Sequence, residues 1–132
     1  MKHPAELALH QYLDHATKGK THMKPETIKQ IGEDVMAAAK RQFGGGNKRD
    51  GFTLRMSNVG RPTCQLWYQK NKPEVAVPPP TTFVMNMMIG DIVEAVFKGI
   101  LKEAGVKYED TDKVSLDLGD DSVSGSYDLI VD

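Results

Sequence analysis

The sequence predicts an α+β fold, and three observations indicate it. Apolar residues recur at helical spacing over residues 5–17, 25–43 and 83–104. Apolar and polar residues alternate in "KVSLDL" and "SVSGSYDLIVD", as they do in half-buried strands. The helical segments come first and the strand segments last, and this order favours α+β or α/β over a helical bundle.

Composition indicates one small domain. The chain has 132 residues, of which 39% are hydrophobic, and this is enough for one core. Its single cysteine, Cys64, excludes an internal disulfide within this sequence.

No stretch approaches the roughly 20 apolar residues that a membrane-spanning helix needs. The first residues, "MKHPAELALHQYLDH", carry charges where a signal peptide has its apolar region. We therefore expect a soluble cytoplasmic protein.

Two helices are expected in the first third of the chain. Leu9, Tyr12 and Leu13 form part of one apolar stripe on a helix over residues 5–17. Pro25 suits the first position of a second helix, because the missing N–H is not needed there. The glycines at 44–46 should end this helix, because glycine readily takes the left-handed cap conformation, and residues 44–51 are expected to form a mobile basic loop.

The middle of the chain is expected to be irregular apart from one short helix. An extended piece over residues 52–56 and a turn over 57–60 should lead into a helix from about Pro62 to Gln69. The stretch "VAVPPPTT" has too many prolines for regular structure and predicts an extended connector.

The segment "FVMNMMIGDIVEAVFKGILKEA", residues 83–104, is the strongest helix in the sequence. It is apolar nearly all round, so we expect one long buried helix that packs against more than one neighbour, ended by Gly105. The two strands that follow are joined by "GDDS", which predicts a β-hairpin.

Basic and acidic residues are separated along the chain. Residues 40–72 carry eight Lys or Arg and one Asp, whereas residues 73–132 carry four basic and twelve acidic residues. A basic segment beside an acidic one suits a protein that holds a polyanion with the first and cations with the second. The alternative, that both segments are solvated surface, fits the charges equally well.

Two carboxylates could carry metal chemistry. Glu94 lies inside the most apolar helix, one turn after Gly90, and a buried carboxylate must be paired, protonated or bound to a cation. The simpler alternative is an ion pair with Lys98, four residues on. Asp128 lies in the last strand, where aspartate is disfavoured, and its simpler alternative is a solvent-facing position. A helix carboxylate and a strand carboxylate could together hold Mg²⁺, which takes one or two carboxylates and keeps several waters.

The segment "RMSNVGRPTCQLWY" is rich in hydrogen-bond donors for phosphate oxygens. These donors are Arg55, Ser57, the backbone amides around Gly60, Arg61, Gln65 and Tyr68. Trp67 could stack on a base, but a lone tryptophan in a small domain is more often part of the core. Cys64 is most simply a small buried side chain.

Taken together, these segments resemble the PD-(D/E)XK nuclease superfamily, in the branch of RecB-type and lambda-type phage exonucleases. "RMSNVGRPTCQLWY" resembles the leading segment of that branch, "GDIVE" (residues 90–94) its Gly-x-x-x-Glu helix motif, and "GSYD" (residues 125–128) its Gly-x-x-Asp strand motif. The match covers residues 55–132. The order and spacing of the motifs, rather than any one of them, carry the resemblance.

The resemblance implies a restriction-endonuclease-like core and metal-dependent hydrolysis of DNA phosphodiesters, by an exonuclease rather than an endonuclease. Glu94 would be the metal ligand on the helix, and Asp128 the principal ligand of Mg²⁺ or Mn²⁺. The residues that the resemblance implies for DNA binding are Arg55, Ser57, Arg61, Tyr68, Lys48 and Arg49. The implied setting is DNA recombination and repair in a bacterial or phage-infected cell.

The sequence departs from the family in one respect. A strand with Glu-x-Lys should follow Asp128, but the sequence ends at Asp132. We therefore expect the N-terminal part of a nuclease domain, little activity on its own, and a second polypeptide as a possible source of the strand. The alternative is a non-catalytic module that binds nucleic acid or a partner protein through the basic segment.

Overall fold

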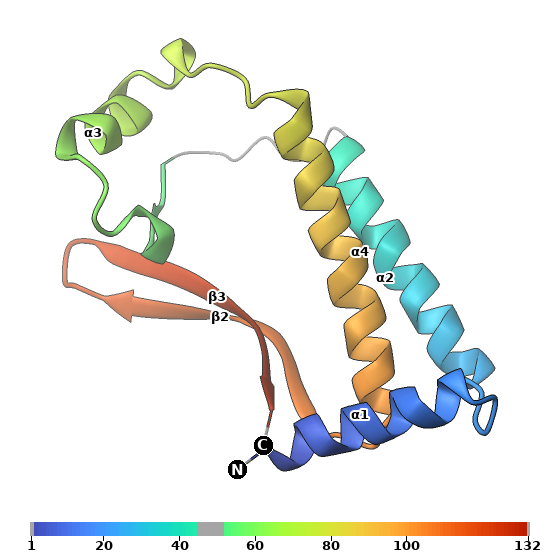
Figure 1. Ribbon diagram of the computed structural model, residues 1–132. Coiled ribbons are helices and arrows are strands. Elements are labelled where there is room, and N and C mark those ends of the chain that lie inside the picture. The colour runs from blue at the N-terminus through green and yellow to red at the C-terminus, as the bar shows by residue number, and fades with distance from the viewer. Residues whose placement is uncertain (1, 45–51, 132) are drawn as a thin grey trace. The chain divides into compact units, whose positions relative to one another are not determined.

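The computed structural model describes residues 2–44 and 52–131, except the side chain of Thr111, and its fold is α+β (Figure 1). The helices are α1 (Pro4–Thr17), α2 (Pro25–Phe43), α3 (Thr63–Asn71) and α4 (Thr81–Glu103), with short 3-10 turns at η1 (Met56–Asn58) and η2 (Pro73–Val75). The strands are β1 (Leu54–Arg55), β2 (Tyr108–Asp117) and β3 (Ser122–Val131). The predicted fold class, long helix and terminal hairpin are confirmed.

The chain divides into two compact units that alternate along the sequence. The first contains Met1–Asn47, Pro80–Tyr108 and Val131–Asp132, and the second contains Lys48–Pro79 and Glu109–Ile130. The first unit therefore holds α1, α2 and α4, while the second holds α3 and nearly all of the sheet. The assignment of the whole chain to one nuclease-like domain stays a prediction.

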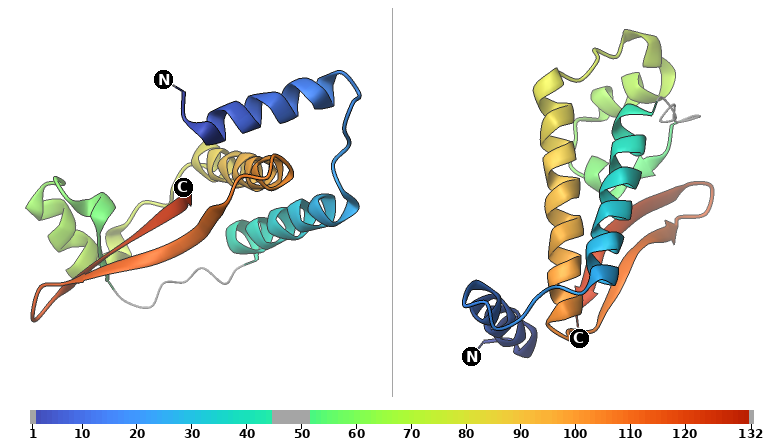
Figure 2. Two further views of the ribbon diagram at one scale, coloured as in Figure 1. Left: turned by 90° about the horizontal axis from the view of Figure 1, so that it is seen from below. Right: turned by 90° about the vertical axis from the view of Figure 1, so that its right-hand side faces the viewer.

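In the first unit α2 and α4 pack side by side in opposite directions, and α1 crosses the C-terminal end of α4 (Figure 2). The two long helices approach closely at Gly99. A Cβ atom at that position would lie 2.5 Å from Cδ1 of Ile31 and 3.4 Å from Cγ2 of Thr27. A residue without a side chain is therefore what lets α2 and α4 pack at this point.

Polar contacts tie both ends of α2 to α4. The Thr27 hydroxyl, on a residue only 1% exposed, donates to Oε1 of Glu103, and the backbone amide of Lys24 donates to the same oxygen at 3.3 Å. At the other end, Nε2 of Gln42 donates to Oδ2 of Asp91 at 3.1 Å. Because a buried hydroxyl without a partner is costly, the Glu103 carboxylate fixes the register of the two helices.

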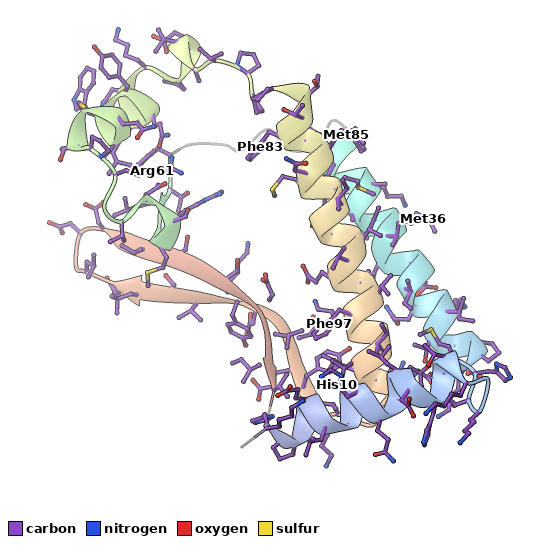
Figure 3. All side chains as sticks on the ribbon, in the orientation of Figure 1. His10, Met36, Arg61, Phe83, Met85 and Phe97 are labelled. Carbon is purple, nitrogen blue, oxygen red and sulfur yellow. The ribbon has the colours of Figure 1, made fainter. Side chains whose placement is uncertain are left out.

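The apolar surface of α4 is only partly buried. Ala95, Gly99 and Leu101 are buried. The exposed apolar side chains of this helix, some of which are labelled in Figure 3, are Phe83, Met85, Met87, Ile89, Ile92, Val93, Val96 and Phe97. α4 contacts both α2 and α1, so the prediction of more than one neighbour is confirmed. The predicted burial is not, because most of its large apolar side chains are exposed.

The second unit is built on a three-stranded sheet in the order β1-β3-β2. β1 pairs with β3 in parallel, with Leu54 opposite Val123 and Arg55 opposite Ser124. β2 and β3 form the predicted hairpin, in which the amide of Leu118 donates to the carbonyl of Asp121 at 2.8 Å. β3 is thus the central strand, and it brings the segment around Arg55 beside the start of β3, at Val123 and Ser124.

Helix termini follow the predicted signals with one correction. Pro25 is the first residue of α2, and Gly105 follows α4 with a φ of 72°, a left-handed conformation that favours glycine. Gly44 caps α2 with a φ of −78°, so the left-handed cap predicted for the glycine run does not occur at this residue. The rest of the predicted loop, residues 45–51, lies outside the described residues.

The predicted connector "VAVPPPTT" is irregular only over residues 76–80, because Val75 belongs to η2 and Thr81 and Thr82 begin α4. The chain makes one 3-10 turn at η2 and then runs without regular structure to Pro80, directly before α4. In the described part of the chain, no helix combines the length and the apolar character that a bilayer crossing would need.

Candidate nucleic-acid interface

A pocket of about 620 Å³ lies in the second unit, where β1 ends beside β3. Its polar lining consists of Thr53, Arg55, Ser57, Lys113, Ser124 and Ser126. Met56, Val114, Gly125 and Tyr127 complete it. Two of the predicted DNA-binding residues, Arg55 and Ser57, are therefore brought together with the predicted Gly-x-x-Asp strand.

Local turns place Ser57 at this pocket. Parallel pairing sets Arg55 opposite Ser124, and the chain then leaves the sheet through η1. The amide of Val59 donates to the carbonyl of Met56, and the amide of Arg61 donates to the carbonyl of Asn58, both at 3.1 Å. Gly60 follows with a φ of 85°, which a residue with a side chain would rarely adopt.

Gly125 has a steric role in the same pocket. A Cβ atom there would lie 2.8 Å from Cγ of Met56 and 3.4 Å from its Cβ. The glycine of the strand motif therefore lets η1 lie against β3, which explains the residue type without any direct role in chemistry.

The charges that line the pocket are positive. Arg55 and Lys113 supply two cations, and no carboxylate occurs among the lining residues. Burial raises the pKa of the Tyr127 hydroxyl above its usual value, and the negative charges of Asp112 and Glu109 add to this shift. Tyr127 therefore keeps its proton throughout the physiological pH range and can act as a hydrogen-bond donor.

Glu94 takes the simpler of its two predicted roles in the first unit. Its Oε1 lies 2.6 Å from Nζ of Lys98, one turn further along α4, with side-chain exposures of 36% and 12%. The predicted i,i+4 ion pair is thus confirmed. Nothing lies within 4 Å of a Cβ built at Gly90, so this glycine leaves open space one turn before Glu94.

Asp128 is exposed on β3, two residues beyond the pocket residue Ser126. Because side chains alternate along a strand, it shares a face with Ser124 and Ser126. Asp128 belongs to the second unit and Glu94 to the first, so their convergence on a metal ion stays a prediction. Residues 2–44 and 52–131 contain no group of three or more His, Cys, Asp or Glu side chains that could hold a metal.

Arg61 and Tyr68 lie outside the pocket, and both are exposed. Arg61 is in the short segment that joins η1 to α3 (Figure 3). The ring of Tyr68 meets that of Trp67 edge to face, with centroids 5.2 Å apart. The remaining predicted DNA-binding residues, Lys48 and Arg49, lie outside the described residues.

Two predictions for this segment are wrong. Trp67, predicted to be in the core, is 52% exposed, and Cys64, predicted to be buried, is also exposed. α3 buries none of its residues, so its apolar side chains have no core to enter within the described structure. The general preference of these residue types for interiors is overridden by the position of the helix.

Sequence reasoning missed Lys113, Ser124 and Ser126 as site residues. The alternation in β3 placed both serines on the same side as Asp128, and this was the available signal. Lys113 reaches the pocket only because β2 pairs with β3, and no local pattern marks it.

Comparison with known proteins adds no relative, because no family model, curated protein or solved structure matches this chain. The resemblance to PD-(D/E)XK nucleases therefore stays a prediction from the motifs.

Proposed function

We propose that the chain binds DNA through its phosphate backbone, with one phosphate group in the pocket of the second unit. The observation that carries this proposal is that Arg55, Lys113, Ser57, Ser124 and Ser126 line one pocket. A guanidinium donates two parallel hydrogen bonds to phosphate, and hydroxyl groups donate to the remaining oxygens.

The segment that leads from the pocket to α3 favours a polyanion over a small anion, whereas the nearby strands carry acidic residues that include Glu109, Asp112 and Asp128. Residues 52–72 contain four basic residues and no Asp or Glu. Three of these basic residues do not line the pocket and are exposed, namely Arg61, Lys70 and Lys72. Several cations spread over one segment neutralise several phosphates of a strand, and the resulting release of counterions drives binding.

The test compares two variants that remove one positive charge each. Arg55→Gln removes a pocket donor, whereas Lys29→Gln removes a charge from a side chain of α2 that is 78% exposed. Fluorescence anisotropy with a short labelled duplex should show a loss of about ten- to a hundredfold for Arg55→Gln, because charge-assisted hydrogen bonds contribute about 1.5–3 kcal/mol. Lys29→Gln should change affinity little. Equal losses would show that binding is general surface attraction and would contradict the pocket.

A second candidate function, metal-dependent hydrolysis of the bound DNA, is favoured by the position of Asp128. It shares a face of β3 with the pocket residues Ser124 and Ser126, about 7 Å beyond Ser126 at the usual rise of a strand. One carboxylate at this position fits a hydrated Mg²⁺, which keeps several waters when few carboxylates bind it. Such an ion, when bound, supplies an activated water and stabilises negative charge on the phosphate.

In this proposal the pocket holds the phosphate in place. Asp128→Asn should abolish Mg²⁺-dependent cleavage of linear duplex DNA and weaken Mn²⁺ binding, while leaving DNA affinity in EDTA unchanged or higher, because a negative charge is removed. Cleavage that persists in Asp128→Asn would come from a contaminant or another site and would remove this candidate.

A further inference from the structure

α3 is a nine-residue helix that buries none of its residues. Its two large aromatic side chains, Trp67 and Tyr68, are 52% and 55% exposed. A helix this short is marginal by itself, and exposed aromatic rings gain none of the stabilisation that burial would give. Such a surface is typical of an element that meets a ligand.

The ring geometry leaves faces for that ligand. Trp67 and Tyr68 meet at an interplanar angle of 89°, with the edge of one ring against the face of the other. An edge-to-face contact occupies one face of one ring only. A planar ligand can therefore stack on the faces that this pair does not use.

The charge around the rings favours an anionic ligand, because three cations outnumber the one carboxylate, that of Glu74 in η2, which contacts α3. Lys70 and Lys72 follow the aromatic pair, Arg61 precedes α3, and no acidic residue occurs between positions 52 and 72. Gln65 adds an exposed amide on the same helix. An apolar protein partner would require the rings but not these cations, whereas a strand of nucleic acid uses both, since its bases stack and its phosphates pair with Lys and Arg.

We propose that α3 is a base-stacking platform for single-stranded DNA, and this inference rests on the proposed binding of DNA phosphate in the same unit. Bases in a duplex are stacked on one another and present no free face, so a stacking platform selects unpaired bases. Ser57 of the pocket and Thr63 at the start of α3 are six residues apart, so they lie within about 20 Å of each other. A strand end that leaves the pocket can thus reach α3.

Trp67 is the only tryptophan, so its fluorescence reports on this site directly. Titration of the full chain with oligothymidylate should quench the emission in a saturable way, whereas a duplex of the same length should quench it less. Trp67→Ala and Tyr68→Ala, followed by anisotropy with a labelled oligonucleotide, should each lower single-strand affinity about tenfold, within the range given by about 1–3 kcal/mol per stacked base. Trp67→Phe, which keeps a ring, should recover part of the loss.

Gln69→Ala, an exposed position on the same helix, is the matched control and should bind like the wild type. Single-strand binding without any change in Trp67 emission, or unaffected by Trp67→Ala, would overturn the platform while leaving the phosphate pocket intact. The pocket itself fails if Arg55→Gln binds duplex DNA as tightly as the wild type. Self-association of the wild type in sedimentation experiments, abolished by Trp67→Ala without any change in DNA affinity, would show that α3 docks on protein and would also overturn the platform.

Discussion

At the scale of single residues, Gly125 and Met56 illustrate how one missing side chain positions a binding site. The Met56 side chain occupies the space that a Cβ at position 125 would need, 2.8 Å from its Cγ. Arg55 and Ser57 flank Met56 and line the pocket, so displacing η1 would move both donors. The glycine therefore affects binding through packing rather than through contact with the ligand.

Gly125→Val should lower both stability and DNA affinity. Overpacking against Met56 costs about 1–3 kcal/mol, and urea unfolding measures this loss. The double variant Gly125→Val with Met56→Ala removes the collision and should recover a large part of both losses. If Met56→Ala recovers nothing, the contact between η1 and β3 is not what limits position 125.

Tyr12 adds a pH dependence to the first unit. Burial raises the pKa of its hydroxyl, and the negative charge of Glu103 adds to the shift. The folded chain thus holds this proton more strongly than the unfolded chain, so its contribution to stability is complete below the ordinary tyrosine pKa of about 10 and is lost as pH rises through the folded pKa. Tyr12→Phe, which cannot ionise, should gain stability relative to the wild type between about pH 8 and pH 10.5 in urea unfolding. A difference between the two proteins that does not change with pH would contradict this assignment.

At the scale of elements, α4 contains two glycines with different roles. The packing of α4 against α2 needs one of them and does not need the other. Gly99 lies at the close approach to Ile31, whereas nothing lies within 4 Å of a Cβ at Gly90. Both positions are inside the same helix and incur the same intrinsic cost of glycine.

The matched pair Gly90→Ala and Gly99→Ala separates packing from helix propensity. Gly90→Ala should stabilise the chain by up to about 1 kcal/mol, because alanine is the better helix former. Gly99→Ala gains the same propensity but collides with Ile31, so it should be about 1–3 kcal/mol less stable than Gly90→Ala. Chemical denaturation of both variants measures the difference, and equal stabilities would show that α2 and α4 are not in close contact at Gly99.

Helix positions could be predicted because their signals are local. The predicted helices over 5–17 and 83–104 agree within two residues with Pro4–Thr17 and Thr81–Glu103. β2 was harder, since it begins at Tyr108, five residues before the predicted "KVSLDL". The intervening residues are mostly polar. They belong to the strand because their backbone pairs with a neighbouring strand, and such pairing does not require an alternation of apolar residues that the sequence would reveal.

The candidate site could be predicted only in part, for a physical reason. Arg55 and Ser57 were identified as donors from their residue types and local order. Their neighbours Lys113, Ser124 and Ser126 join them only through strand pairing between distant segments, which local patterns do not encode. Trp67 was misassigned because residue preferences for burial hold on average and not for a helix that lacks a core.

At the scale of the whole molecule, the two units have different roles in this account. The first is a helical unit that carries Glu94 in an ion pair, and the second contains the pocket, the exposed aromatic pair and a basic segment without acidic residues. DNA binding is therefore expected to be centred on the second unit, and to weaken steeply with salt because phosphate contacts dominate.

The measurement that tests this central claim most directly is an NMR titration of the isotope-labelled chain with a short DNA duplex. The account predicts that amide shifts change most at Ser57, Ser124, Gly125 and Ser126, saturate together, and diminish in Arg55→Gln. Helix α2, which carries the exposed charged side chains of Lys29 and Glu33, should change little. Changes centred on α2, or spread evenly over both units, would contradict the claim that the pocket beside β3 holds the DNA phosphate.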